Sequence, residues 1–215
     1  MIDRSRILVV AATDREADCF RGSGLRVIVS GVGRTNAAVA TTLAVAGRTD
    51  SPLVISAGIA GSLPVGENTP KIGSLVLGTA ACYAEEGLMT AEGFTSIAEM
   101  GFPLAAFAEG NSITADSGLF EALRGAFPEV ATGPIATVAT CSGTDGLAAE
   151  IALRTGAIAE AMEGAAVLHA ARLLGAGAVE LRSISNRTGD RERQDWRLPE
   201  AFEALRSAAA ALSLI

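Results

Sequence analysis

The chain has few of the residues from which several common kinds of active site are built. Among its 215 residues there is one His (His169), one Lys (Lys71) and three Cys, and aromatic residues make up only 4%. No cysteine spacing resembles a zinc knuckle, and a His-based zinc site or a Ser-His-Asp triad would depend on His169 alone. His169 falls in a helical stretch, where a packed or solvent-facing side chain is the commoner case. The composition therefore argues against both kinds of chemistry.

Basic residues are also too few to suggest a nucleic-acid partner. The formal net charge is −7, with 17 Lys and Arg against 24 Asp and Glu, whereas nucleic-acid binding needs clustered positive charge. No apolar run reaches the roughly 18 residues of a membrane span, and Met1–Arg6 is too polar for a signal peptide. The widely spaced Cys19, Cys82 and Cys141 suit reduced thiols. We expect a cytoplasmic protein without nucleic-acid or membrane partners.

Apolar runs alternate with Ala-rich helical stretches along the chain, which is typical of an α/β domain. With 49% apolar residues, a chain of this length can bury a large core in one domain, residues 1–215. The expected strands are 7–12, 25–30, 53–57, 74–81 (a strand or a hairpin arm), 133–140, 157–160 and 178–185. The expected helices are 35–46, 117–127, 147–155, 163–174 and 199–212. We predict a mixed or parallel central sheet flanked by helices on both faces, with an irregular segment at Cys82–Asp116.

An Asn closes the last expected strand, in Leu181-Arg-Ser-Ile-Ser-Asn186. In open α/β sheets, ligands bind at the carboxyl ends of strands. Asn cannot titrate, but its amide both donates and accepts hydrogen bonds, which suits the recognition of a flat heterocycle. The following Arg187, Arg191 and Arg193 form either a solvated loop or a group that grips a carboxylate.

Two glutamates, Glu16 and Glu163, stand at junctions between an expected strand and a helix. A Glu in the first turn often only complements the helix dipole. Alternatively, Glu16 points into the crevice at the end of the first strand, and Glu163 binds two hydroxyls of a sugar. Both interpretations stay open on spacing alone.

Two Gly-rich turns follow strands. Gly31-Val-Gly33 lacks the third Gly of a dinucleotide fingerprint, because position 36 is Asn. It is better interpreted as a tight turn, which can still aim backbone amides at an anion. Gly58–Gly61 is equally well a structural turn or a loop that approaches a ligand closely.

Taken in order, these segments resemble the nucleoside phosphorylase and nucleosidase superfamily. The resemblance is greatest to the methylthioadenosine/S-adenosylhomocysteine nucleosidases and, within them, to the branch that cleaves futalosine. Val9–Glu16 resembles the segment that supplies the water-activating Glu, and Ser56–Leu63 resembles the Gly-rich strand end beside the ribose, with Ile59 where adenosine nucleosidases carry Ser. Ala161-Met162-Glu163 resembles the Glu-Met-Glu signature, with Ala161 replacing the first Glu. The resemblance covers most of the chain and is weakest in Cys82–Asp116.

The resemblance implies a three-layer phosphorylase/hydrolase-like fold and assigns roles to residues. Glu16 is implied as general base, and Asn186 as the residue that stabilises the leaving base. The implied substrate-binding residues are Gly61, Gly143, Leu147, Met162, Glu163 and Arg187. The family implies no metal or organic cofactor, a small-molecule nucleoside as substrate, and a homodimer or higher homo-oligomer.

The residue at position 186 bears on the base that is released. Adenosine-type nucleosidases have Asp there, whereas an Asn amide can donate to a 6-oxo group or N7 and accept from N1–H. Unpaired buried polar groups cost about 1–3 kcal/mol each, so Asn186 favours a 6-oxopurine. We therefore expect hydrolysis of the N-ribosidic bond of futalosine, a menaquinone-biosynthesis step that releases hypoxanthine.

Three alternatives stay open. The first is a methylthioadenosine/S-adenosylhomocysteine nucleosidase, which would release adenine. The second is a purine nucleoside phosphorylase, which needs a cationic phosphate cradle; Arg34 follows the first Gly turn, but no Arg stands beside Gly58–Gly61. The third is a protein that binds nucleosides without cleaving them.

Overall fold

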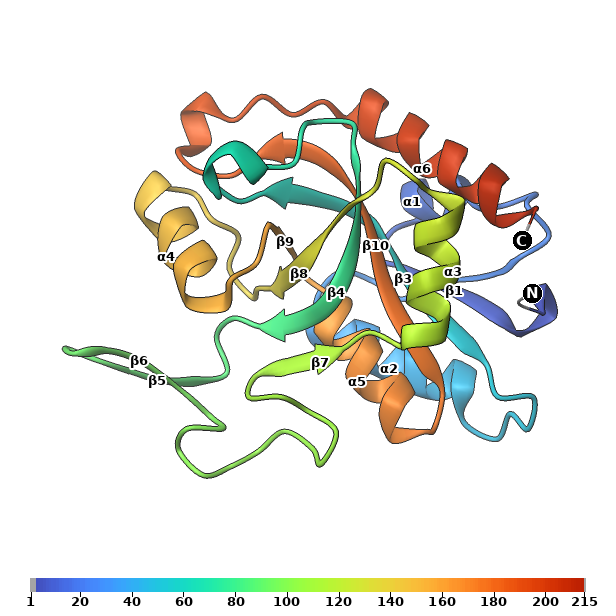
Figure 1. Ribbon diagram of the computed structural model, residues 1–215, viewed down its shortest axis with the longest axis horizontal. Helices are drawn as coiled ribbons and strands as arrows, with labels where there is room; N and C mark the ends of the chain where they lie inside the picture. The colour runs from blue at the N-terminus through green and yellow to red at the C-terminus, as the bar shows by residue number, and fades with distance from the viewer. Residues whose placement is uncertain (1–2, 215) are drawn as a thin grey trace.

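An eight-stranded mixed sheet forms the centre of the computed structural model, which describes residues 3–214 (Figure 1). The first two residues of Met1–Arg6 and the last residue of the expected domain lie outside the described part. The strands of the sheet are β1 (Ile7–Ala11), β2 (Arg26–Val29), β3 (Leu53–Ser62), β4 (Leu75–Tyr83), β7 (Ser112–Thr114), β8 (Ala131–Thr137), β9 (Ala159–Ala161) and β10 (Gly177–Arg187).

The long strand β10 organises the sheet. It pairs in parallel with β3 and antiparallel with β4, while β4 pairs with β8, β8 with β9, and β9 with β3. These five strands therefore follow one another in a closed ring. Strands β1 and β2 extend the sheet from β3 in parallel. The ends of β1, β3 and β10 are thereby brought to one edge.

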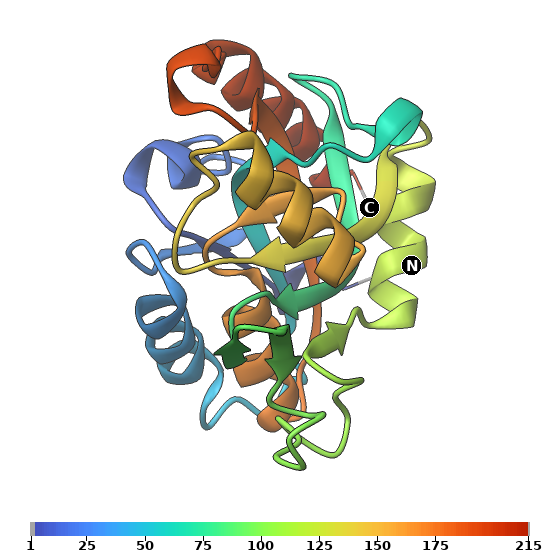
Figure 2. The same ribbon diagram turned by 90° about the vertical axis from the view of Figure 1, so that its left-hand side faces the viewer.

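Helices cover both faces of the sheet (Figures 1 and 2). The helices are α1 (Asp14–Asp18), α2 (Arg34–Val45), α3 (Ser117–Ala126), α4 (Asp145–Thr155), α5 (Gly164–Leu173) and α6 (Leu198–Leu212), with short 3-10 turns at Arg4–Arg6, Gly66–Asn68 and Arg191–Arg193. In β1, Ile7 and Val9 pack with α3 and α6, whereas Leu8 and Val10 pack with α2 and α5. A strand buried on both faces reads as a continuous apolar run, because neither set of alternating side chains meets water.

The expected strands and helices are present with small changes at their ends, except that the strand expected at 53–57 continues to Ser62 as β3. The α/β prediction is confirmed, with a mixed sheet flanked by helices on both faces. Of the expected strand 74–81, residues 75–81 lie in β4, which is paired with β10 and β8 and is not a hairpin arm of β3. Among residues 3–214, no helix has the length and apolar character that crossing a membrane requires.

The segment Cys82–Asp116 is less irregular than expected. It contains β7 and a hairpin of β5 (Gly87–Thr90) and β6 (Gly93–Ser96), which extends away from the body of the molecule (Figure 1). No residue of the hairpin is fully buried: all four residues of β5 are exposed, and three of the four in β6 are half-buried. Without one buried side, the alternation of apolar and polar residues that identifies a strand is missing.

Candidate active site

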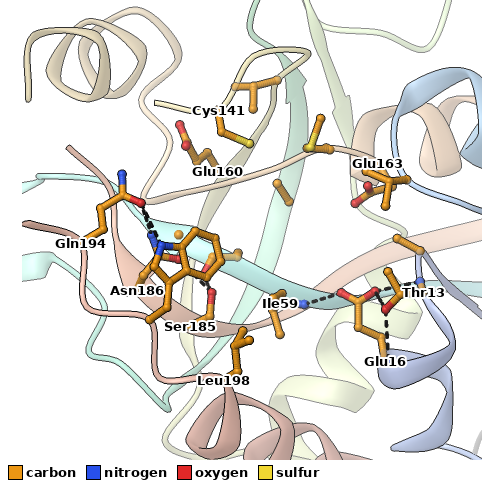
Figure 3. A pocket seen from close by; sticks show the side chains of 18 of the residues that line it. Thr13, Glu16, Ile59, Cys141, Glu160, Glu163, Ser185, Asn186, Gln194 and Leu198 are labelled. Atoms are coloured by element: carbon orange, nitrogen blue, oxygen red, sulfur yellow. Dashed lines mark hydrogen bonds between the residues drawn. The ribbon is translucent and has the colours of Figure 1, made fainter. Parts of the chain in front are cut away.

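A cavity of about 610 Å³ lies where β1, β3 and β10 end, a volume typical of a site for a small molecule. Its wall also includes the loop after β8, the junction between β9 and α5, and residues between Arg191 and Phe202. Figure 3 shows Glu16 and Glu163 towards one end of the cavity, and Asn186 and Gln194 towards the other. We call these the carboxylate end and the amide end.

Glu16, on α1, is held at the carboxylate end by three hydrogen bonds. Its Oε2 accepts from the backbone N–H (3.0 Å) and the hydroxyl (2.8 Å) of Thr13, and its Oε1 accepts from the N–H of Ile59 at 2.9 Å. Thr13 also accepts from the N–H of Glu16, which completes a capping box. Glu16 is only 4% exposed. Because an ionised carboxylate has about four acceptor positions, one stays free for another donor.

A glycine at position 58 makes this arrangement possible. A Cβ there would overlap the Glu16 carboxylate and would lie 2.6 Å from Nη1 of Arg182. Both side chains therefore approach the backbone of β3 because it carries no side chain at this point. The prediction of a turn at Gly58–Gly61 is wrong, because these residues lie inside β3; they form a part of the strand where charged side chains of the protein itself come close to the backbone.

Glu163 is the second carboxylate at this end and immediately precedes α5. Its Oε1 accepts from the N–H of Gly33 at 3.0 Å, and its Oε2 lies 3.3 Å from Nη2 of Arg182. The turn Gly31–Gly33 therefore does aim a backbone amide at an anion, and that anion is a side chain of the protein. Glu163 is 6% exposed, so its orientation is fixed by partners and not by solvent.

A buried ion cluster that was not predicted from the sequence lies behind Glu163. Arg182 donates from Nε to Oε1 of Glu180 at 2.8 Å and from Nη2 to Oγ of Ser56 at 3.2 Å. Burial raises the pKa of Glu180 to about 7, although Arg182 opposes the shift. Residues 178–185 were interpreted as an apolar strand. The signal that reveals the cluster is the spacing of Glu180 and Arg182, two residues apart and hence on one face of the strand.

Asn186 lies at the amide end and is 3% exposed. Its Oδ1 accepts from the hydroxyl of Ser185 at 2.9 Å. Its Nδ2 donates to the carbonyl of Arg187 at 3.2 Å and to Oε1 of Gln194 at 3.4 Å. These two bonds of Nδ2 are long for an amide donor, so the N–H groups of Asn186 are the more available part of the side chain.

Gln194 connects Asn186 to a mostly exposed segment, Gly189–Arg197. Its Oε1 also accepts from the indole N–H of Trp196 at 3.1 Å and from Nη1 of Arg191 at 3.2 Å, and its Nε2 donates to the carbonyl of Ser142 at 3.0 Å. Arg191 lies over the Trp196 ring, 5.2 Å from the centroid, within cation–π range. Gln194 was not among the predicted residues, because a Gln in a polar loop carries no distinctive sequence signal.

The structure brings six of the eight predicted site residues to the cavity wall: Glu16, Gly61, Gly143, Met162, Glu163 and Asn186. Leu147 and Arg187 do not line it. Leu147 packs beside the apolar cluster around α4, and its N–H donates to the Thr144 hydroxyl. Arg187 is exposed at the end of β10.

The remaining basic candidates are distributed differently. Arg191 lines the cavity, as does Arg15, which was not considered. Arg193 forms ion pairs with Asp145 and Asp190. Arg34 pairs with Glu86 at 2.8 Å.

His169 lies away from the cavity, with its ring edge-on to two aromatic rings, those of Tyr83 and Phe107. Its packed position agrees with the expectation that His169 is a packed or solvent-facing residue and not a catalytic one. Within residues 3–214, no group of three or more His, Cys, Asp or Glu side chains could hold a metal ion.

Comparison with known proteins gives a uniform result. The family model described as the phosphorylase superfamily matches residues 21–215. A futalosine hydrolase of Streptomyces coelicolor is 37% identical over 196 residues, which are 88% of this chain and 79% of that protein. Those of Acidothermus cellulolyticus (40% identical; 86% of this chain and 74% of that protein) and Thermus thermophilus (36% identical; 90% and 83%) are similar to a comparable degree.

Solved structures agree on the fold. The S-adenosylhomocysteine nucleosidase of Streptococcus pyogenes, in complex with 5-methylthiotubericidin, superimposes with a TM-score of 0.76 at 17% identity, covering 96% of this chain and 94% of that one. The methylthioadenosine/S-adenosylhomocysteine nucleosidase of Neisseria meningitidis gives 0.71 at 22% identity, covering 96% and 95%. These likenesses confirm the expected three-layer fold.

Proposed function

This chain belongs to the phosphorylase superfamily, and on that basis we propose that it hydrolyses the N-ribosidic bond of futalosine to release hypoxanthine and dehypoxanthine futalosine. The similar proteins named futalosine hydrolase, at 36–40% identity over most of the chain, support this activity. The single structural observation that carries the choice of base is the buried Asn186 amide at the opposite end of the cavity from Glu16 and Glu163.

The carboxylate end suits the chemistry at the sugar. As the bond between the base and C1′ lengthens, the electron pair leaves with the purine and positive charge develops on the ribose. Glu163 binds the ribose hydroxyls, and its negative charge stabilises that state. Glu16 uses its free acceptor position to orient a water molecule and takes its proton as the oxygen attacks C1′. The departing base gains one proton, so the sum of the reaction is the addition of water.

The amide end suits the departing base. An amide N–H of Asn186 donates to the 6-oxo group or N7 of hypoxanthine, where negative charge accumulates during cleavage. A carboxylate at this position would repel that 6-oxo group and would favour a 6-amino group instead. Because Asn186 has a buried donor with only long hydrogen bonds, a 6-oxopurine satisfies it better than a 6-aminopurine does.

One assay tests the proposed function. The protein is incubated with futalosine, inosine and methylthioadenosine, each with and without phosphate, and the released base is identified by chromatography. We expect hypoxanthine from futalosine at a rate independent of phosphate. Faster release of adenine from methylthioadenosine, or formation of a ribose 1-phosphate only when phosphate is present, would contradict it. Binding of nucleosides without release of any base would favour the non-catalytic alternative.

We also propose a homodimer or higher homo-oligomer in the cytoplasm, as expected from the resemblance and the cysteine pattern. The hairpin β5–β6 and the loop after it expose large apolar side chains: Leu88, Met89, Met100 and Phe102. Exposed apolar groups gathered on one projecting segment suit burial against another subunit. Sedimentation equilibrium of the purified protein tests this, and a monomer at micromolar concentration would exclude it.

A further inference from the structure

A third carboxylate, Glu160 on β9, lines the cavity and has no part in the mechanism above. It is 6% exposed. Figure 3 places it beside Cys141, apart from Glu16 and Glu163. A carboxylate buried at a cavity wall needs partners for its oxygens, because burying an unpaired charge costs a large free energy.

Ser142 supplies two of those partners. The backbone N–H of Ser142 donates to Oε1 of Glu160 at 2.8 Å, and its hydroxyl donates to Oε2 at 2.6 Å. Two consequences follow. The carboxylate is fixed in one orientation. In addition, the backbone N–H of Ser142, in the loop after β8, already donates to Glu160 and is not available to a ligand. At this point the cavity wall therefore presents an acceptor.

The acceptor capacity of Glu160 is not exhausted. An ionised carboxylate offers about four lone-pair positions, and Ser142 uses two of them. Among residues 3–214, no Arg or Lys lies within ion-pair distance of Glu160. Burial raises the pKa of Glu160, and the two hydrogen bonds from Ser142 oppose the shift by stabilising the ionised form. Among residues 3–214, no other donor bonds the remaining lone pairs of Glu160. A ligand in the cavity can supply that donor.

Asn186 offers the complementary group. Its Oδ1 already accepts from Ser185, while its N–H groups make only long bonds. Ser142 connects Glu160 to this end, because its carbonyl accepts from Gln194 while its N–H and hydroxyl donate to Glu160. The amide end thus presents a donor at Asn186 and an anionic acceptor at Glu160. A 6-oxopurine carries an acceptor, O6, next to a donor, N1–H. A 6-aminopurine carries the reverse order, with a lone pair on N1.

We infer that Glu160 accepts the N1–H of the 6-oxopurine while Asn186 donates to its 6-oxo group, so that Glu160 is a second residue that selects the base. This inference rests on the proposed function and deepens it. It assigns N1–H to a carboxylate, whereas the sequence prediction assigned it to the oxygen of Asn186. An N1 lone pair facing Glu160 would be repelled, so the same residue both favours 6-oxopurines and rejects 6-aminopurines.

The test compares the variant E160Q with the wild type, using two free bases as probes. Hypoxanthine has N1–H, whereas 6-methoxypurine keeps an oxygen at position 6 but has a lone pair at N1. We expect E160Q to bind hypoxanthine about 5- to 10-fold more weakly in titration calorimetry, because the Gln oxygen can still accept N1–H but the hydrogen bond no longer involves a charged group. Its affinity for 6-methoxypurine should stay equal or rise, because the new amide can donate to N1. Equal weakening for both bases would overturn the inference.

Matched variants separate recognition from structure. S142A keeps the carboxylate but frees it, so hypoxanthine should still bind better than 6-methoxypurine. E85Q removes the same charge from a neighbouring carboxylate, which bonds the backbone of Ala139 and Thr140 outside the cavity, and should leave the ratio unchanged. If E160Q fails to fold, E160D can replace it. Its side chain is shorter by one methylene, which moves the carboxylate away from the base and should weaken the binding of hypoxanthine but not that of 6-methoxypurine. A shift of the ratio in E85Q as large as in E160Q would contradict the inference.

Futalosine hydrolysis by the same variants distinguishes a failure of the inference about Glu160 from a failure of the proposed function. If the wild type releases hypoxanthine and E160Q keeps its selectivity for hypoxanthine over 6-methoxypurine, the inference fails and the proposed function stands. If the wild type releases no base from futalosine, the proposed function fails, and the two affinities still decide whether Glu160 recognises N1–H.

Discussion

The two ends of the cavity are built in different ways. At the carboxylate end, Glu16 and Glu163 accept backbone N–H groups from β3 and from the turn before α2, and Arg182 anchors Glu163 from β10. At the amide end, Asn186 also lies on β10, but its partner Gln194 belongs to the mostly exposed segment Gly189–Arg197. Trp196 in that segment is 44% exposed.

This difference separates two requirements of the reaction. Groups that act on developing charge are most effective when they are already oriented, because no free energy is then needed to reorganise them. Groups that recognise a base and its substituents must admit and release a ligand, which a surface segment does more easily than a strand. The following predictions test whether the two ends behave as differently as they are built.

The largest effect is expected from E16Q at the carboxylate end. The amide of Gln keeps the size of the side chain but cannot take a proton from water, so kcat should fall about 10²- to 10⁴-fold, the usual contribution of a general base. KM for futalosine should change little. Stopped or continuous release of hypoxanthine measures both constants. D18N, an exposed change on the same helix, is the control, and a full rate in E16Q would remove Glu16 from the mechanism.

A large loss of stability is expected from R182M. Removing Arg182 leaves Glu180 and Glu163 buried without their cation, which costs about 3–5 kcal/mol for a broken buried ion pair. Urea unfolding followed by circular dichroism measures the change. The control R206M breaks a surface pair with Glu203 and should cost less than about 1 kcal/mol. Similar losses in both variants would mean that the buried cluster is no more important to the fold than a surface pair.

At the amide end, N186D should change selectivity more than stability. A carboxylate repels the 6-oxo group and accepts from a 6-amino group, so the ratio of kcat/KM for futalosine over methylthioadenosine should fall about 5- to 150-fold, the equivalent of 1–3 kcal/mol. Competition between the two nucleosides in one reaction measures that ratio. N36D, an exposed change on α2, serves as control. An unchanged ratio in N186D would remove the argument that Asn186 recognises the base.

Much of this arrangement could be predicted from the sequence. Both faces of β1 are apolar, so the continuous run 7–12 located the sheet, and the Gly31–Gly33 turn after β2 located its edge. Six predicted site residues gather at one cavity because the carboxyl ends of parallel strands meet there. The family resemblance, which the comparisons confirm, supplied the roles.

The rest depends on contacts between residues far apart in the chain. Ser142 and Glu160, or Asn186 and Gln194, are ordinary residues until the fold brings them together. Arg182 was overlooked because a strand with one charged pair still reads as apolar on average. The hairpin β5–β6 was not predicted because none of its residues is fully buried. Local periodicity reports burial, and it says nothing of which buried polar groups are partners.

The buried cluster also predicts how stability depends on pH. The pKa of Glu180 is about 7 in the folded protein, compared with 4.5 for an unperturbed Glu side chain such as that of the unfolded chain. Between these two pH values the folded state therefore holds a proton that the unfolded state has released. The free energy of unfolding contributed by Glu180 is therefore full below pH 4.5 and is lost as pH rises through about 7. E180Q should abolish that decline in urea midpoints measured from pH 5 to 8. Parallel curves for E180Q and the wild type would refute the link.

The smallest effect is expected in the exposed segment. Arg191 lines the cavity beside Trp196, whereas Arg193 is engaged by Asp145 and Asp190 outside it. If Arg191 binds the carboxylate of futalosine's 5′ extension, R191A should raise KM for futalosine about 3- to 10-fold, the modest value of a solvated ion pair, and leave KM for inosine unchanged. R193A should alter neither. Initial rates with the two substrates measure this difference. Equal changes for futalosine and inosine in R191A would mean that Arg191 only supports Gln194 and Trp196, and the amide end would then be as preorganised as the carboxylate end.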